Sequence, residues 1–346
     1  MMKKKRQGKY TVNFENPPLI RSYAAVVGKK EAEGPLGRYF ENICDDPMMG
    51  RDSWEEAEGE LQYTTVIKAL DNGNFRTEDM DYLFAGDLLG QTIATSFGVM
   101  ELQIPHFGLY GACSTMGESL SLAAMAIDGG FARRAAAVTS SHYASAEKQF
   151  RFPLAYGNQR SLAATWTVTG SGAVILEDAA ECPEKESGKY VRVTGITTGK
   201  IIDYGIKDSQ NMGACMAPAA AFVIANHLKD MKRQPEDYDR IITGDLGTVG
   251  QKILFELMGE EGYDIRKVHM DCGIEIFDHE SQDTHAGGSG CGCAAVTLCS
   301  YILNQLETGG WKRVLFVPTG ALLSKISFNE GLSIPGIAHG VVLENS

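Results

Sequence analysis

The chain has 346 residues and a formal net charge of −12, with 44% hydrophobic and 22% charged residues. This composition is typical of a soluble globular protein with a substantial core. The acidic balance argues against nucleic acid as a partner, because phosphate binding needs clustered Lys and Arg. No run of about 18 apolar residues occurs, so we expect no membrane-spanning segment.

The eight cysteines are scattered, with no Cys-x-x-Cys pair and no Cys/His spacing that resembles a zinc site. No signal peptide precedes them. We therefore expect reduced thiols in a cytoplasmic-type compartment, and neither a metal site nor a cofactor of the protein's own.

The first residues are strongly basic, with five Lys or Arg between positions 3 and 9. We expect residues 1–12 to form a disordered arm, either a plain solvated leader or a contact with an anionic membrane surface. Residues 34–52 are rich in Gly, Pro and Asp, which is typical of a loop. A helix is predicted to begin after Ser53, where Ser53 and Glu56 form a capping-box pattern, and to end near Gly73.

An internal repeat follows. Residues 79–88 (DMDYLFAGDL) match residues 237–246 (DYDRIITGDL), and Asp87 corresponds to Asp245 at an offset of 158. A second match pairs Cys113 with Cys293, each followed by a Gly-Gly pair and a strand, at an offset of 180. The two offsets differ because the second half carries an insertion, which we place around residues 277–290.

Each half therefore reads as strand, helix, strand, cysteine-bearing helix and strand. Strands that alternate with helices predict parallel sheets with right-handed crossovers. We predict an α/β protein with two similar halves, residues 13–190 and 191–346. Residues 142–164 form a long connection, and Pro153 and Gly157 argue against one continuous helix there. Such a connection is either functional or a surface excursion or dimer arm.

Cys113 lies where an apolar segment meets a predicted helix. A thiol at a helix N-terminus is close to unpaired N–H groups and the positive end of the helix dipole, which favours thiolate. A buried core cysteine is the simpler alternative. The repeat places Cys113 near the join between the halves, where α/β proteins commonly bind ligands.

This pattern resembles the thiolase superfamily, whose members have two similar halves and a nucleophilic cysteine at the start of a buried helix. The resemblance implies a thiolase-like fold with mixed or parallel sheets and buried helices. In condensing enzymes, loops of the second half add His, or His and Asn, to activate the thiol. Here the corresponding loops, residues 244–247 and 287–293, contain neither. His285 lies nearby as a substitute or as a surface histidine.

A closer resemblance covers nearly the whole chain. The segments FENPP (14–18), AGDLL (85–89), GLYGACSTMGESL (108–120), MAPAA (216–220) and AGGSGC (286–291) resemble the stage V sporulation protein AD family. The resemblance implies a role in moving dipicolinic acid into the developing spore. It also implies peripheral attachment to the cytoplasmic face of the spore inner membrane, beside membrane-spanning stage V sporulation proteins. A homodimer is expected from the superfamily.

Dipicolinate is a planar aromatic dianion, often paired with calcium, so its site needs N–H or cationic donors and a flat wall. The N-terminal amides after Cys113 suit one carboxylate and Arg151 the other, while Asp245 can hold calcium or fix a donor. The ligand-binding residues that we predict are Cys113, Ser114, His142, Arg151, Tyr156, Trp166, Asp245, His285 and Ser289.

We expect binding without catalysis. Two alternatives remain open at this stage. One is an acyl transferase or condensing enzyme that uses Cys113 with His142 or His285 as the base. The other is a purely structural adaptor for a membrane channel.

Overall fold

The computed structural model describes residues 5–150, 160–182 and 190–345. The first half contributes five strands to a sheet in the order β6-β5-β7-β9-β3, in which β9 is antiparallel to both neighbours and β5 is parallel to β6 and β7. These strands are β3 (Leu19–Gly28), β5 (Tyr82–Gly86), β6 (His106–Gly108), β7 (Arg134–Ser141) and β9 (Gly170–Glu177).

The second half repeats this arrangement in the order β12-β11-β14-β16-β10, with β16 antiparallel to both neighbours. Its strands are β10 (Arg192–Thr198), β11 (Arg240–Thr243), β12 (His269–Asp271), β14 (Arg313–Val317) and β16 (Gly336–Glu344). The two sets meet where Arg192 of β10 pairs with Leu19 of β3. The predicted duplicated α/β fold is confirmed.

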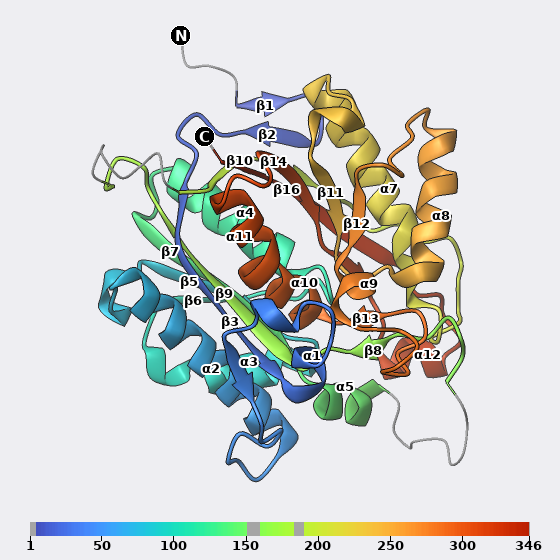
Figure 1. The fold of residues 1–346 in the computed structure, drawn as a ribbon, viewed down its shortest axis with the longest axis horizontal. Coiled ribbons are helices and arrows are strands. Elements are labelled where there is room, and N and C mark those ends of the chain that lie inside the picture. The colour runs from blue at the N-terminus through green and yellow to red at the C-terminus, as the bar shows by residue number, and fades with distance from the viewer. Residues whose placement is uncertain (1–4, 151–159, 183–189, 346) are drawn as a thin grey trace.

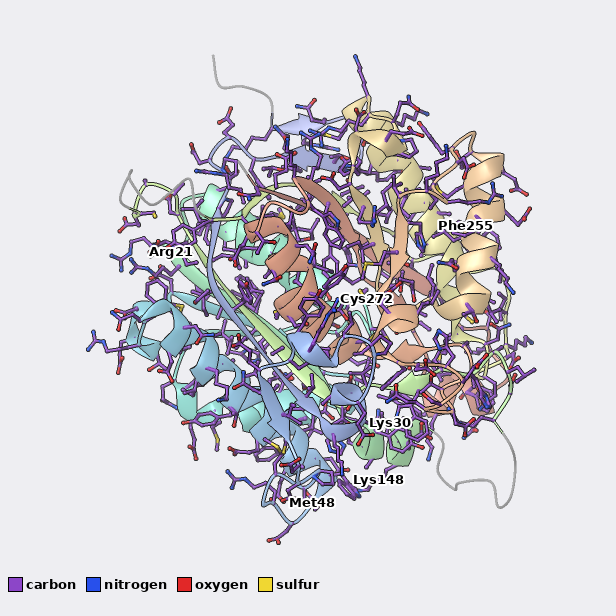
Figure 2. All side chains as sticks on the ribbon, in the orientation of Figure 1. Arg21, Lys30, Met48, Lys148, Phe255 and Cys272 are labelled. Carbon is purple, nitrogen blue, oxygen red and sulfur yellow. The ribbon has the colours of Figure 1, made fainter. Side chains whose placement is uncertain are left out.

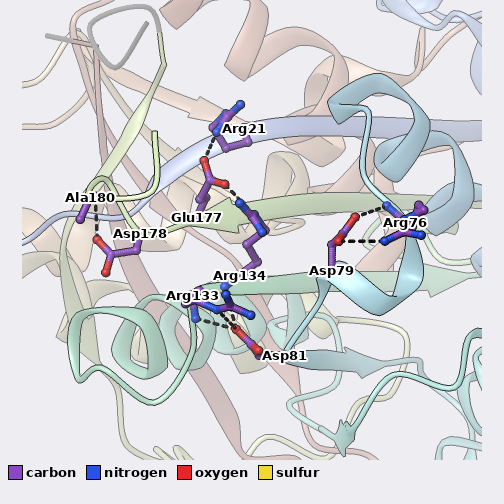
Figure 3. Close-up of polar contacts among 9 residues, drawn as sticks. All are labelled: Arg21, Arg76, Asp79, Asp81, Arg133, Arg134, Glu177, Asp178 and Ala180. Carbon is purple, nitrogen blue, oxygen red and sulfur yellow. Dashed lines mark hydrogen bonds and ion pairs between the residues drawn. The ribbon is translucent and has the colours of Figure 1, made fainter. Parts of the chain in front are cut away.

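The repeat extends to individual side chains. In the first half, a carboxylate oxygen of Asp81 accepts the N–H groups of Arg133 and Arg134, at 2.7 and 3.2 Å. The Arg134 side chain then donates to Glu177 at 2.6 Å, and Arg21 pairs with the same carboxylate (Figure 3). These contacts tie the beginning of β5 to the beginning of β7 and the end of β9.

The second half uses the same residue types at the same places. Asp239 accepts the N–H groups of Lys312 and Arg313, at 2.7 and 2.9 Å, and Arg313 pairs with Glu344 at the end of β16. Asp239 corresponds to Asp81, at the offset of 158 residues that relates the two repeats in the sequence.

Two helical segments form the middle of the molecule. One is α4 (Thr115–Asp128), which packs on β5 and β7 and also on β16 of the other half. The other runs from α10 (Cys291–Thr297) through a π-helical turn at Leu298–Ile302 into α11 (Leu303–Glu307), and α10 packs on β7 and β9. Each buried helix therefore contacts both halves, and one apolar core spans them.

Longer helices cover the outer faces. The helix α2 (Trp54–Gly73) packs on β3 and β9, and α7 (Met212–Met231) packs on β16, on opposite sides of the molecule in Figure 1. As predicted, α2 begins after Ser53, whose Oγ accepts the Glu56 N–H at 3.2 Å, and ends at Gly73 before a left-handed Asn74.

The predicted insertion lies between β12 and α10. It follows α9 (Cys272–Ile276) and contains β13 (Gly288–Ser289), and β13 pairs in parallel with β8 (Trp166–Thr167) of the first half. The remaining elements are α1 (Lys29–Ala32), β4 (Asn42–Cys44), α3 (Ile93–Gly98), α5 (Tyr143–Phe150), α8 (Gly247–Glu260), β15 (Thr319–Ala321), α12 (Lys325–Asn329) and short 3-10 turns.

The prediction of a disordered arm at residues 1–12 is wrong for residues 5–12, while residues 1–4 lie outside the described chain. The strands β1 (Arg6–Gln7) and β2 (Thr11–Asn13) form a hairpin, and β2 adds to β10. Lys5 donates to the Asp128 carboxylate at 2.8 Å. The β-branched pair Thr11-Val12 suits a strand, and β10 offers it hydrogen-bond partners. Within the described residues, no helix is long and apolar enough to cross a membrane.

Candidate functional site

Cys113 is held in a tight turn between β6 and α4. Ala112 adopts a left-handed φ of 48°, and the Ser114 Oγ donates to the Gly111 carbonyl at 2.7 Å. Thr115 Oγ1 donates to the Ala112 carbonyl at 2.6 Å and accepts the Gly111 N–H at 3.1 Å. These bonds fix the turn, and Cys113 itself stays partly exposed at the wall of a pocket.

Asp245, which follows β11 in the second half, faces Cys113. Its carboxylate accepts the Gly290 N–H at 2.9 Å and the Thr319 hydroxyl at 2.8 Å, and it receives a hydrogen bond from the Cys113 thiol. Only 1% of its surface is exposed. Burial raises the pKa of Asp245 to about 7, against the hydrogen bonds that stabilise its charge.

The same surroundings keep Cys113 protonated. Burial raises the pKa of the Cys113 thiol well above its usual value, and the neighbouring Asp245 and Cys291 raise it further. The expectation that a helix N-terminus favours thiolate here is therefore wrong. The helix α4 begins only at Thr115, and desolvation together with an adjacent carboxylate outweighs its dipole.

The pocket at Cys113 lies between the halves and is narrow. The volume that water can reach in this pocket is about 60 Å³, which is room for about four molecules. The walls are mostly apolar, and none of the described residues that line the pocket is a Lys, Arg or His. The lining residues are Leu88, Tyr110, Ala112, Cys113, Ala146, Glu147, Phe150, Thr165, Thr167, Met212, Asp245, Ser289, Gly290, Ala321 and Leu323.

The structure brings three of the predicted site residues together, namely Cys113, Asp245 and Ser289. Ser114 is buried beside them, but its hydroxyl is used by Gly111. Arg151 and Tyr156 lie outside the described residues, so the structure does not place them.

The two histidines that were candidate bases lie elsewhere. The His142 ring is bonded to the Pro47 carbonyl at 2.8 Å and to the Ala144 N–H at 3.1 Å. The His285 ring is bonded to the Ser161 carbonyl at 2.8 Å and to Asp283 at 3.1 Å. Neither ring lines the Cys113 pocket, so neither is placed to take the proton of the thiol. Trp166 and His142 instead line a second pocket.

Sequence reasoning missed several wall residues, above all Glu147 and Phe150 of α5 and Met212 at the start of α7. Glu147 is buried and adds a second carboxyl group to the pocket. No motif marks these residues, because only the packing of α5 and α7 around the join brings them to Cys113.

The pair of half-repeats, with a thiol before a buried helix and facing loops of the second half, defines a thiolase-like fold. Solved structures share this fold. A single-residue variant of OleA from Xanthomonas campestris matches 96% of this chain and 99% of its own, with a TM-score of 0.60 and 14% identity. The 3-oxoacyl-[acyl-carrier-protein] synthase III from Aquifex aeolicus VF5 matches 94% and 99%, with a TM-score of 0.56 and 12% identity.

A protein family matched by sequence is much closer to this chain than these solved structures are. Residues 8–344 match the family described as Stage V sporulation protein AD (SpoVAD). Stage V sporulation protein AD of Bacillus subtilis (strain 168) is 44% identical over 342 residues, which cover 99% of this chain and 98% of that protein. The chain belongs to the stage V sporulation protein AD family.

Proposed function

We propose that this sporulation protein binds dipicolinic acid as its calcium chelate in the Cys113 pocket, without acyl transfer, and supports its uptake into the developing spore. The observation that carries the proposal is the buried Asp245 opposite Cys113, at the place where a condensing enzyme needs a base. A carboxyl group that disfavours thiolate suits a binding site better than a nucleophilic one.

Charge favours the chelate over the free dianion. Asp245, a buried carboxyl group, lines the pocket beside Cys113. A bare dicarboxylate is repelled there, whereas calcium accepts additional carboxylate oxygens as ligands. Since the pocket is narrow, entry requires movement of wall side chains such as Phe150 and Leu323.

The cellular setting is part of the proposal. The protein acts at the cytoplasmic face of the spore inner membrane, peripherally, beside membrane-spanning stage V sporulation proteins. The N-terminal hairpin offers Arg6 and the exposed Lys9 to anionic lipid, since Lys5 is already paired with Asp128.

The protein is further proposed to form a homodimer through β6. This strand ends the sheet of the first half, and all three of its residues are exposed. Phe107 on β6 is 51% exposed, and Phe97 and Met100 nearby in the chain are more exposed still. An open strand edge beside exposed apolar side chains can pair with the same edge of a second copy.

The test is a calorimetric titration with calcium dipicolinate. A second titration uses dipicolinate alone, in a buffer whose chelator removes calcium. We expect binding of the chelate only. Asp245→Asn should weaken it at least tenfold because a carboxylate oxygen is lost, while the exposed control Asp264→Asn should not. For Cys113→Ser, the binding free energy of the chelate should stay within about 1 kcal/mol of the wild-type value, the scale of one altered hydrogen bond.

Intact-mass analysis after incubation with acyl-coenzyme A separates the binder from an enzyme. We expect no adduct on Cys113. A stable thioester that is absent in Cys113→Ser would establish acyl transfer and overturn the proposal.

A further inference from the structure

A polar pocket lies where the two halves meet along β3, separate from the Cys113 pocket. It has about 480 Å³ of space, and its walls come from β3, β4 and α2 of the first half and from the π-helical turn and α11 of the second. One of its wall residues, Arg21, lies near the left edge of the molecule in Figure 2. The polar pocket and the Cys113 pocket share no lining residue.

The polar pocket follows a gap in the sheet. On the side of β3 that faces away from β9, β10 pairs with Leu19 and β4 pairs from Val26 onward. Among the described strands, none pairs with residues 21–25 on that side. The backbone of β3 therefore meets side chains there instead of a neighbouring strand.

Two asparagine amides take the place of that strand. Asn72 Nδ2 donates to the Tyr23 carbonyl at 2.9 Å, and Asn42 Nδ2 donates to the Ala25 carbonyl at 3.2 Å. Because a carbonyl accepts only from the nitrogen of an amide, these bonds fix which way each amide faces, and each Oδ1 is left as an acceptor. Within the described residues, neither Oδ1 accepts a hydrogen bond. Since Tyr23 and Ala25 are two residues apart on a strand, the two amides are held about 7 Å apart.

The second half supplies the opposite wall. The π-helical turn Leu298–Ile302 places Cys299 and Ser300 in the pocket, and Asn304 follows in α11. A π-helical turn departs from the regular helical hydrogen bonds and is frequent at functional sites. The Asn304 side chain has no hydrogen-bond partner among the described residues, so it offers the pocket both a donor and an acceptor.

The charged wall residues leave one donor without a partner. Arg21 is paired with Glu177, as Figure 3 shows, but its Nε atom is buried and has no hydrogen-bond partner in the described structure. A buried N–H without an acceptor is costly, and a ligand oxygen would remove that cost. The other charged residues of the wall, Arg38 and Glu41, have opposite signs. The wall therefore offers hydrogen bonds more than net charge.

We propose that this polar pocket binds a neutral polyhydroxylated molecule, a sugar or another polyol. Its hydroxyl groups donate to the amide oxygens of Asn42 and Asn72 and accept from Asn304 and Arg21. A hydroxyl group both donates and accepts, so it satisfies amide oxygens and N–H donors alike. An apolar ligand would leave these groups unsatisfied, and a strongly charged ligand would meet both signs of charge on the wall.

Saturation-transfer difference NMR on the full chain tests the proposal, because it detects the weak binding expected when a ligand exchanges water for protein hydrogen bonds. The probes are glucose, myo-inositol and trehalose, compared with cyclohexanol, which has the same ring size as myo-inositol but a single hydroxyl. We expect a saturable signal from at least one polyol and at least tenfold weaker binding of cyclohexanol. No saturable signal from any polyol, or equal binding of cyclohexanol, would overturn the proposal.

Variants locate the site. Asn304→Leu and Asn72→Leu should each weaken binding of the polyol at least tenfold, whereas the exposed control Asn16→Leu should leave it unchanged. Thermal unfolding checks that each variant is folded, and Asn72 is exposed at the rim, so its replacement leaves the core intact. Unchanged polyol binding in both folded variants would also overturn the proposal.

The same variants separate this inference from the proposed function. Calcium dipicolinate reports on the Cys113 pocket and should bind Asn304→Leu and Asn72→Leu as it binds the wild type. Chelate binding without polyol binding would refute this inference alone, and polyol binding without chelate binding would refute the proposed function alone.

Discussion

The two halves place an aspartate at the same point after their second strands, yet the two side chains have different roles. Asp87 of the first half bonds locally: its carboxylate accepts the Leu89 N–H at 2.7 Å and both the N–H and the hydroxyl of Thr95, at 2.7 and 2.6 Å. Asp245 of the second half bonds only to distant segments and lines the Cys113 pocket.

A third aspartate explains the difference. In the second half, Asp271 accepts the N–H groups of Leu246 and Gly247, at 2.9 and 3.1 Å, and so holds the turn after β11. Asp245 is thereby free to face Cys113. Both halves thus hold a buried acid after the strand, and only the half with a separate acid for the turn has its aspartate in the site.

The largest expected effect is on stability, and it tests whether Asp87 and Asp245 have different roles. Asp87→Ala leaves two N–H groups and a hydroxyl unpaired in the core, so we expect a loss of about 3 kcal/mol in the free energy of unfolding. Asp245→Ala should cost only about 1 kcal/mol, because water in the pocket can replace its bonds. Denaturant unfolding at pH 7 measures both, and equal losses would show that the two aspartates have the same role.

The open edges of the two halves differ in the same way. All of β6 is exposed, whereas β12, its counterpart, is mostly buried. If β6 joins two copies, Phe107→Asp should weaken dimerisation about a hundredfold, since it buries charge in the interface. Analytical ultracentrifugation at several protein concentrations measures the dimerisation, with the exposed Phe131→Asp as the control. A wild-type monomer would refute the β6 dimer.

The last expected effect is a change in how stability varies with pH. Because burial raises the pKa of Asp245 to about 7, folding retains its proton, and the resulting stabilisation is lost as pH rises from about 4 through 7. Asp245→Asn should make the unfolding free energy fall less steeply over that range, by up to about 1.4 kcal/mol per pH unit. Parallel curves for the variant and the wild type would show that Asp245 ionises normally.

Much of this architecture follows from local pattern. The repeat around Gly86-Asp87 and Gly244-Asp245 predicted the duplicated fold, and the mismatch of offsets located the insertion. Ser53 and Glu56 predicted where α2 begins. These predictions succeeded because turns, caps and strands depend on residues close together in the chain.

Other features depend on contacts that no local pattern records. The raised pKa of Cys113 depends on burial at the join between the halves and, after that, on the approach of Asp245 from the other half. The separation of Trp166 and His142 from Cys113 follows from the path of β8, which no periodicity shows. The basic start resembled a solvated arm, yet β10 recruits Thr11 and Val12 into a sheet.

That N-terminal hairpin also bears on how the chain acquires its structure. The Thr11 hydroxyl is bonded to Thr197 at 2.9 Å, Thr197 to His227 at 2.7 Å, and His227 to Tyr238, so the first strands synthesised are tied to the interior of the half made last. Their partners leave the ribosome only after some 180 further residues have been added, since residue 11 pairs with residue 197. The halves are therefore not independent folding units, and an isolated fragment of residues 191–346 would lack the strand that covers β10.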